Sequence, residues 1–187
     1  MFLDRDGVLV ATDVRDGAAY AVTTLADFRV LPDVAAQVAR LRAAGLVCIV
    51  FTNQPEVARG TIAPEVIAAM HDHLRAAVPV DDVYVCPHDD ADQCACRKPR
   101  PGMLEQAAAR WGVRLADSFV IGDRWRDIGA GRAAGCYTVL LEREYSGAAA
   151  ADARVATLAE AVDAVLARLK ILGGASRASG PRGRRRG

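Results

Sequence analysis

The sequence predicts an α/β fold in which a Rossmann-like, mostly parallel sheet is covered by helices on both faces. Short apolar runs alternate with longer stretches that have the periodicity of amphipathic helices, an order typical of β/α units. With 187 residues and 52% hydrophobic content, the chain can build one well-packed domain, and it is too short for two comfortable ones. We therefore expect a single domain organised around one sheet.

The apolar runs are the candidate strands. They are short, and each is bounded by polar residues, glycine or proline. They lie at residues 1–4, 46–51, 82–86, 118–121 and 137–141.

Helical periodicity fills the intervals between these runs. Asp33 is expected to cap a helix that places Val34, Val38 and Leu41 on one face and stops at Gly45. Similar patterns predict further helices at residues 64–76, 101–111, 124–134 and 155–169.

Two segments lack such patterns. Residues 7–32 are weakly periodic and are expected to form a small insertion or flap after the first strand, with no large cap. Residues 1–172 should form the single domain, and residues 173–187 a disordered basic tail. The net charge of the whole chain is only +1, and its basic character belongs to this tail, which has no acid and carries Arg177, Arg182, Arg184, Arg185 and Arg186.

The composition also indicates where the protein is located in the cell and which partners it can bind. No apolar run approaches the ~20 residues needed to span a bilayer, and the chain opens without a secretory leader. We therefore expect a cytoplasmic protein with no membrane partner, and a monomer because the domain is small. Five cysteines in such a compartment fit metal ligands or buried thiols better than disulfides. The arginines of the tail have no aromatic residues among them and no folded element is predicted there, so they are a weak basis for nucleic-acid binding. Nucleic-acid binding is kept only as an alternative role for the tail.

Polar side chains follow the first two predicted strands at the point where each strand ends. Asp4 and Asp6 come directly after the first strand, and Gly7 permits a turn that brings both carboxylates to one cation. Thr52 and Asn53 follow the second strand and offer a hydroxyl and an amide to phosphoryl oxygens. Because open parallel sheets bind ligands beyond the carboxyl ends of their strands, we expect these side chains to share one site.

Two more groups complete this set. Arg97 and Lys98 precede the helix predicted at residues 101–111 and are cations of the kind that bind phosphate. Asp123 follows the fourth strand, with Asp127 four residues further on. Each group alone is common in solvated loops, but their joint occurrence, in this order and at strand ends, is hard to produce by chance.

These residue types suit phosphoryl transfer. A carboxylate can attack phosphorus, but its charge repels a phosphate dianion. Mg²⁺ neutralises both, and a lysine takes up further charge in the transition state. A second carboxylate can protonate the leaving oxygen and then activate water. The sequence therefore predicts a magnesium-dependent phosphatase that acts on a small phosphorylated metabolite.

The four groups stand in the segments FLDRDGVL, FTNQ, RKP and IGDRWRD. Together they resemble the four motifs of the haloacid dehalogenase (HAD) superfamily, subfamily IIIA, over residues 1–145. The resemblance implies an aspartyl-phosphate intermediate on Asp4, the nucleophile, with Asp6 as the general acid and base. It implies Thr52 and Lys98 as stabilisers of the phosphoryl group.

The same resemblance implies the ligands of the magnesium ion. These are Asp4, the backbone carbonyl of Asp6, and Asp123, with Asp127 placed behind them.

A second constellation lies between the third predicted strand and the Arg-Lys pair. Three cysteines and one histidine stand within eleven residues: Cys86, His88, Cys94 and Cys96. Three thiolates and one imidazole can form a closed tetrahedral set, as in structural zinc sites. The expected task of this Zn²⁺ is to fix the loop that presents Arg97 and Lys98.

The zinc-clipped loop narrows the resemblance to two groups of small phosphatases. The segments ARG at 58–60 and KPRPGM at 98–103 resemble enzymes acting on D-glycero-D-manno-heptose 1,7-bisphosphate, whereas the short gap from His88 to Cys94 resembles histidinol-phosphate phosphatases. Glu56 follows Pro55 where the heptose enzymes often have Ser-Gly. We favour the heptose bisphosphate 7-phosphatase, with histidinol-phosphate phosphatase as the alternative.

Substrate binding is assigned to Asn53, Arg59 and Arg97, and Glu56 is available for a cationic substrate. A catalytically silent, zinc-clipped binding module is the alternative from another class. It is disfavoured because a protein without catalytic activity would not need all of the predicted catalytic and magnesium-binding residues, and this chain has them all.

Four other residues are expected to have only structural roles. His71 and His73 lie in a helical stretch far from the motifs and are expected to be surface or packing residues. Cys48 and Cys136 lie in or beside apolar strands and are expected to be buried thiols.

Overall fold

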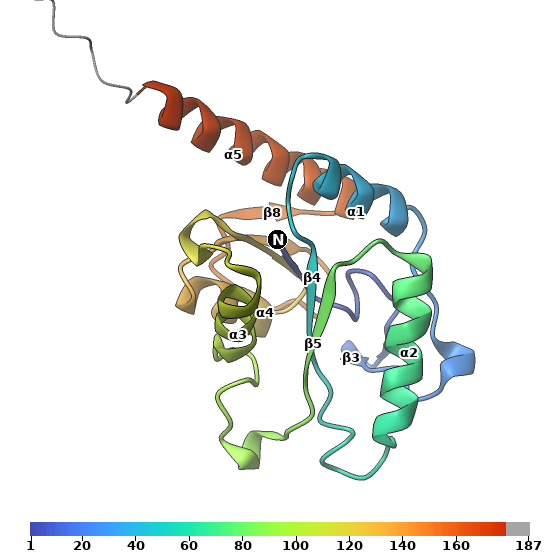
Figure 1. Cartoon of the computed structure of the whole chain (residues 1–187). Coiled ribbons are helices and arrows are strands. Elements are labelled where there is room, and N and C mark those ends of the chain that lie inside the picture. Colours follow the sequence, from blue (N-terminus) through green and yellow to red (C-terminus); the bar gives the residue numbers. More distant parts are fainter. Residues whose placement is uncertain (179–187) are drawn as a thin grey trace, which may run out of the picture.

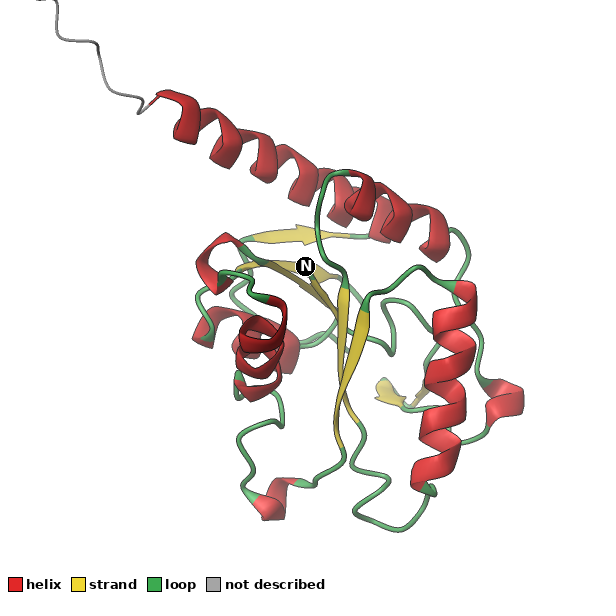
Figure 2. Cartoon of the chain, viewed as in Figure 1, coloured by secondary structure: helices red, strands yellow, loops and turns green. Residues whose placement is uncertain are grey.

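The computed structural model describes residues 1–178, with side chains as far as residue 172. Within this range a six-stranded sheet has the order β5-β4-β1-β6-β7-β8, and every pair of neighbours is parallel (Figures 1 and 2). The strands are β1 (Phe2–Leu3), β4 (Ile49–Asn53), β5 (Asp82–Cys86), β6 (Phe119–Gly122), β7 (Tyr137–Leu141) and β8 (Ala153–Val155). The predicted α/β fold class is confirmed.

Helices cover both faces of the sheet. They are α1 (Val34–Ala43), α2 (Pro64–Ala77), α3 (Gly102–Trp111), α4 (Trp125–Ala133) and α5 (Leu158–Ala178). Helices α1 and α5 lie side by side, with α2 further along the same side, whereas α3 and α4 lie on the other side (Figure 1).

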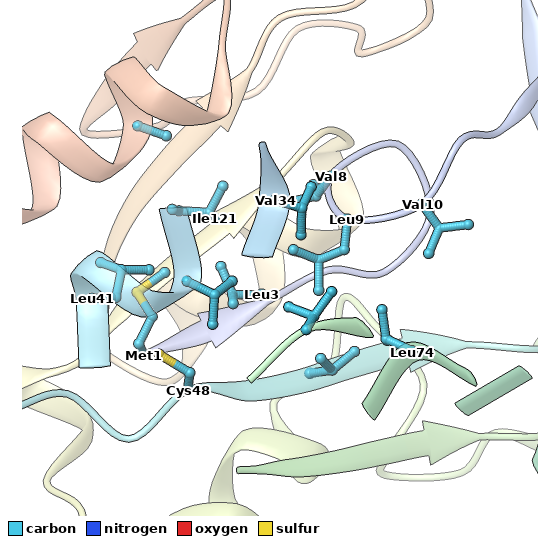
Figure 3. Packing of buried hydrophobic residues seen from close by; sticks show 14 of the residues in the cluster. Met1, Leu3, Val8, Leu9, Val10, Val34, Leu41, Cys48, Leu74 and Ile121 are labelled. Atoms are coloured by element: carbon cyan, nitrogen blue, oxygen red, sulfur yellow. The ribbon is translucent and has the colours of Figure 1, made fainter. Parts of the chain in front are cut away.

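The alternation of strand side chains explains the two layers. Leu3 lies level with Val50 and Ile121, and all three belong to the larger buried cluster with α1, α2 and α5. Figure 3 shows part of this cluster, with Leu3 and Ile121 of the sheet near Leu41 of α1. Phe2, one residue earlier, points to the opposite cluster against α3 and α4. Each fully buried aliphatic side chain stabilises the fold by ~1.5–3 kcal/mol, so both faces hold the sheet together.

Strand β1 is shorter than the predicted run 1–4 because the chain turns immediately after it. The backbone N–H of Asp4 still donates to the carbonyl of Ile121 at 3.0 Å, and the Arg5 carbonyl then accepts from two residues of the following turn. Gly7 has φ +83°, and a Cβ there would lie 1.9 Å from an Asp123 carboxylate oxygen. The turn therefore needs glycine, and it places Asp6 next to the strand ends.

The predicted flap at residues 7–32 contains a small hairpin. Strands β2 (Asp13–Arg15) and β3 (Ala18–Tyr20) pair antiparallel, and the 3₁₀ helix η1 (Leu25–Asp27) follows them. Asp16 and Gly17 both have positive φ, as a two-residue hairpin turn requires.

Two details of the predicted helices were wrong. Asp33 has a left-handed backbone (φ 61°), and its side chain makes no capping hydrogen bond to α1. The helix predicted at 155–169 begins later, at Leu158, because Val155 pairs with Leu141 in β8. Gly45, with φ +84°, follows the end of α1 as expected.

Helix α5 continues to Ala178, so it covers the first part of the segment predicted as a disordered tail. Arg182, Arg184, Arg185 and Arg186 of that tail lie outside the described residues. Among the described helices, none combines the length and apolar composition that a bilayer crossing demands.

Candidate active site

The carboxyl ends of β1, β4 and β6 bring the predicted catalytic side chains together. Asp4 and Asp6 follow β1, Thr52 lies near the end of β4, and Asp123 follows β6. All four are buried, and the first three line a cavity of about 900 Å³ together with Lys98. The structure therefore places the predicted groups at one edge of the sheet.

Lys98 lies at the centre of this group. Its Nζ donates to Asp4 Oδ1 and to Asp127 Oδ1, both at 2.6 Å, and to the Phe51 carbonyl at 3.1 Å. Asn53 holds the backbone of Lys98 from both sides, since its Oδ1 accepts the N–H at 3.1 Å and its Nδ2 donates to the carbonyl at 3.2 Å. The Asn53 side chain, which the sequence analysis assigned to substrate binding, thus also positions Lys98.

The buried carboxylates carry more negative charge than Lys98 can balance. Burial, followed by the charge of Asp127, raises the pKa of Asp4 well above its usual range, although Lys98 opposes this shift. The same two causes raise the pKa of Asp123 to about 6, against a hydrogen bond from Tyr145. Burial alone would lower the pKa of Lys98, but Asp127 and Asp4 outweigh it and raise that pKa. A further cation would relieve this excess.

The donor set fits a magnesium ion. Carboxylate oxygens of Asp4, Asp123 and Asp127 all lie within 4.8 Å of one another. Oδ1 of Asp123 is buried and has no hydrogen-bond partner, while its Oδ2 accepts from the Tyr145 hydroxyl at 2.8 Å. An unpaired buried carboxylate oxygen beside two others is the hard oxygen environment that Mg²⁺ prefers.

The Asp6 side chain is directed to a different set of partners. Its Oδ1 accepts from Arg5 Nε at 3.1 Å, and its Oδ2 accepts from Arg5 Nη2 at 2.9 Å and from Gln54 Nε2 at 3.0 Å. It lines the cavity but is outside the cluster of possible metal ligands found among the described residues. This geometry leaves the Asp6 side chain in the cavity beside Asp4 and Lys98 without making it a metal ligand, as a general acid and base would require.

The predicted zinc ligands also come together. Distances among the Sγ atoms of Cys86, Cys94 and Cys96 are 3.2–3.6 Å, and His88 Nδ1 lies 3.7 Å from Cys86 Sγ and 3.3 Å from Cys96 Sγ. A tetrahedral zinc with Zn–S bonds of ~2.3 Å has S···S edges of about 3.8 Å, so the cluster has roughly the size of a metal site. Although burial opposes it, hydrogen bonding from Cys96 lowers the pKa of Cys94 to about 7. These four residues could hold a metal ion.

The two predicted substrate-binding arginines line the cavity, held by acids of the loop between His88 and Cys94. Arg97 Nε donates to Asp90 at 2.7 Å, and Arg59 Nε donates to Asp89 at 2.6 Å. Arg126 Nη1 also donates to Asp90, at 3.0 Å. The loop that carries the cysteine cluster therefore also orders the arginines at the mouth of the cavity.

This chain is similar in sequence to known phosphatases. Residues 95–170 match the family model described as HAD-hydrolase-like. The D-glycero-β-D-manno-heptose-1,7-bisphosphate 7-phosphatase of Pseudomonas aeruginosa is 39% identical over 147 residues, which cover 76% of this chain and 80% of that protein. The protein of the same name from Rhodopseudomonas palustris is 40% identical over 146 residues, covering 72% and 78%. The chain belongs to this family of HAD phosphatases.

A solved structure of a HAD phosphatase has the same fold as this chain. The D,D-heptose 1,7-bisphosphate phosphatase from B. bronchiseptica, complexed with magnesium and phosphate, superposes with a TM-score of 0.77 at 32% identity, covering 90% of this chain and 98% of that one. The resemblance to the HAD superfamily and the prediction of a phosphatase are thus confirmed, and the magnesium of that structure supports Mg²⁺ as cofactor.

Several residues at this HAD site were not identified from the sequence. His71 of α2, expected to be a surface or packing residue, is buried, and its Nε2 lies 3.0 Å from Arg5 Nη1 of the first motif although the two are far apart in sequence. Arg124 lines the cavity beside the fourth motif. The signal for His71 was its position on the apolar face of α2, between Ile67 and Leu74.

Proposed function

We propose that this HAD phosphatase removes the 7-phosphate of D-glycero-D-manno-heptose 1,7-bisphosphate through an aspartyl-phosphate on Asp4. The observation that carries the proposal is the buried Asp4 carboxylate, held by Lys98 at the end of β1 within an oxygen cluster that suits magnesium. The names of relatives 36–40% identical to this chain supply the substrate.

The residues divide the reaction between them. A carboxylate oxygen of Asp4 attacks phosphorus, the bond from phosphorus to the sugar oxygen breaks, and Asp6 gives its proton to that oxygen. Asp6 then takes a proton from a water molecule that attacks phosphorus, the bond from phosphorus to the Asp4 oxygen breaks, and inorganic phosphate and the free Asp4 carboxylate are released. Lys98, Thr52 and Asn53 hold the phosphoryl oxygens during both steps.

Two metal ions would complete this site. Magnesium held by Asp4, the Asp6 backbone carbonyl and Asp123, with Asp127 behind them, would supply the positive charge that allows one anion to attack another. A structural zinc on Cys86, His88, Cys94 and Cys96 would fix the loop that ends at Lys98.

The second phosphate of the substrate would meet the arginines of the cavity. Arg59 and Arg97 line it, and guanidinium groups suit bidentate recognition of phosphate. A cytoplasmic location and a monomeric state remain predictions.

Histidinol phosphate is the alternative substrate, and one observation favours it. Glu56 lines the cavity, and its Oε2 is buried without a hydrogen-bond partner. Such an oxygen can accept from an ammonium or imidazolium group of the substrate, or from a sugar hydroxyl.

The deciding experiment measures phosphate release with Mg²⁺ from heptose 1,7-bisphosphate, histidinol phosphate and several sugar monophosphates. We expect kcat/KM for the heptose bisphosphate to exceed the others by a hundredfold or more, ~2.7 kcal/mol of discrimination. A preference for histidinol phosphate that Glu56→Gln abolishes would replace our proposal with the alternative. If the protein with bound magnesium released no phosphate from any of these substrates, the catalytically silent binding module would become the favoured interpretation.

A further inference from the structure

Arg5 is a buried cation whose partners stand in the active site. It lies between Asp4 and Asp6 in the sequence, and its side chain is fully buried. Its Nη2 donates to Gln54 Oε1 at 2.7 Å as well as to Asp6, and its guanidinium lies 5.5 Å from the centre of the Phe28 ring. A charge so completely removed from water needs every partner it has, because an unsatisfied one is costly.

Two of the four hydrogen bonds that the Arg5 side chain makes go to Asp6. The Nε and Nη2 donors bind separate Asp6 oxygens at 3.1 and 2.9 Å, a two-point contact that restricts rotation of the carboxyl group. Gln54 adds a third constraint, since its Nε2 donates to Asp6 Oδ2 at 3.0 Å and lies 3.1 Å from Thr52 Oγ1. A general acid acts efficiently only when its proton is aimed at the leaving oxygen, so this restraint bears on the reaction.

His71 closes the far side of Arg5. Its Nε2 lies 3.0 Å from Arg5 Nη1, and because arginine only donates, this nitrogen must be the acceptor. Burial, and then the charge of Arg5, lower the pKa of His71 to about 4, so the ring is neutral at pH 7 and free to accept. Without His71, Nη1 would be a charged donor buried with no partner from α2.

We propose that His71 and Arg5 are positioning residues for the general acid and base Asp6, with His71 holding Arg5 and Arg5 aiming the carboxyl group. This inference rests on the role given to Asp6 under the proposed function. It assigns to α2, which supplies no residue of the four motifs, control of proton transfer to the leaving group.

The test exploits the leaving group. A sugar alkoxide needs a proton as it departs, whereas nitrophenolate is stable enough to leave without one. Single-turnover rates, with enzyme in excess, isolate phosphorylation of Asp4 from its later hydrolysis. We would measure them for the preferred sugar phosphate and for p-nitrophenyl phosphate, with saturating Mg²⁺.

His71→Leu removes the acceptor at similar volume. We expect the rate on the sugar phosphate to fall about 10- to 100-fold, within the usual contribution of general acid catalysis, while the rate on p-nitrophenyl phosphate falls less than about threefold. KM for the sugar phosphate, from separate steady-state kinetics, should change little. His71→Gln, which restores an acceptor, should return most of the sugar-phosphate rate.

His73→Leu is the matched control. His73 lies on the same helix but is exposed, and its ring contacts Phe28 rather than Arg5. It should leave both rates unchanged. Arg5→Lys, which keeps the charge but loses the two-point contact, is the second variant and should show the same selective loss as His71→Leu.

Equal slowing of both substrates, or no slowing, would overturn the inference. If both His71→Leu and Arg5→Lys fail to fold, the pair is purely structural and the inference is equally overturned. Failure of the proposed function is a separate result, since the wild-type protein would then release no phosphate from the sugar phosphate.

Discussion

The active site has two regions of opposite character. The inner cluster consists of four buried residues: Asp4 and Asp123 follow β1 and β6, Lys98 precedes α3, and Asp127 lies in α4. The arginine rim, Arg59, Arg97 and Arg126, surrounds the cavity mouth and is held by Asp89 and Asp90 of one loop. Arg97 is buried, but the Arg59 side chain is 50% exposed and that of Asp90 is 63% exposed.

Under the proposed function, this difference separates the residues of the chemical step from those that recognise the substrate. Buried charges interact strongly, and separating them costs much free energy, so the side chains of the inner cluster should keep one arrangement during the reaction. Exposed ion pairs are worth ~0–1 kcal/mol each, so the rim can exchange its carboxylate partners for a substrate phosphate at little cost. Changes to the inner cluster should therefore affect kcat, and changes to the rim should affect KM.

The largest effect is expected at the nucleophile. Asp4→Asn should reduce turnover by at least ~10⁴-fold, because an amide cannot form the acyl-phosphate, whereas the fold should survive an isosteric change. Phosphate release and thermal melting check both parts. Asp27→Asn, an exposed carboxylate that lines the same cavity, is the control and should stay within a fewfold of wild type. Residual activity of the Asp4 variant above a hundredth of wild type would contradict the assignment.

Half of the inner cluster could be predicted from the sequence because Asp4 and Asp123 stand directly at strand ends, whereas Lys98 and Asp127 were recognised through their motifs. Asp4 and Asp123 follow apolar runs, and parallel strands bring such positions together whatever the loops do. The contact of His71 with Arg5 could not be predicted, because it depends on how α2 packs against a turn more than sixty positions away in sequence. Gln54, two residues after Thr52, was recognised in its motif but not as a partner of Asp6.

Some local features of secondary structure were also missed in the sequence analysis. The Asp-Gly at 16–17 is a known hairpin signal, and it could have predicted β2 and β3. Strand β8 has three residues, Ala-Arg-Val, and no apolar run to mark it; it exists because β7 offers a free edge. The Asp33 cap failed because the backbone enters α1 left-handed, which composition alone does not reveal.

An intermediate effect is expected at the cysteine cluster, which links the two regions. Cys94→Ser should lower zinc content well below that of wild type and lower Tm by about 5 °C, since under our proposal a zinc ion at this cluster orders the loop that ends at Lys98. Turnover by the protein that remains folded should fall less than in Asp4→Asn. Cys136→Ser, a buried thiol outside the cluster, is the control and should keep its zinc. Metal-free wild-type protein purified under reducing conditions would refute the zinc site.

The smallest effect is expected at the rim. Asp90 accepts from Arg97 at 2.7 Å and from Arg126 at 3.0 Å, so it occupies the cations that a second phosphate would need. Asp90→Asn removes that competing charge and should lower KM for the bisphosphate about two- to fivefold with kcat unchanged. Steady-state kinetics on heptose 1,7-bisphosphate checks this.

Comparison with a monophosphate decides whether the rim reads the second phosphate. A sugar monophosphate has only the group that enters the inner cluster, so its KM should not respond to Asp90→Asn. Asp92→Asn changes an acid of the same turn that binds the Asp89 backbone and no rim arginine, and it should leave both KM values unchanged. If KM fell equally for both substrates, Asp90 would act through the overall charge of the cavity mouth. The division between a catalytic interior and a phosphate-reading rim would then be wrong.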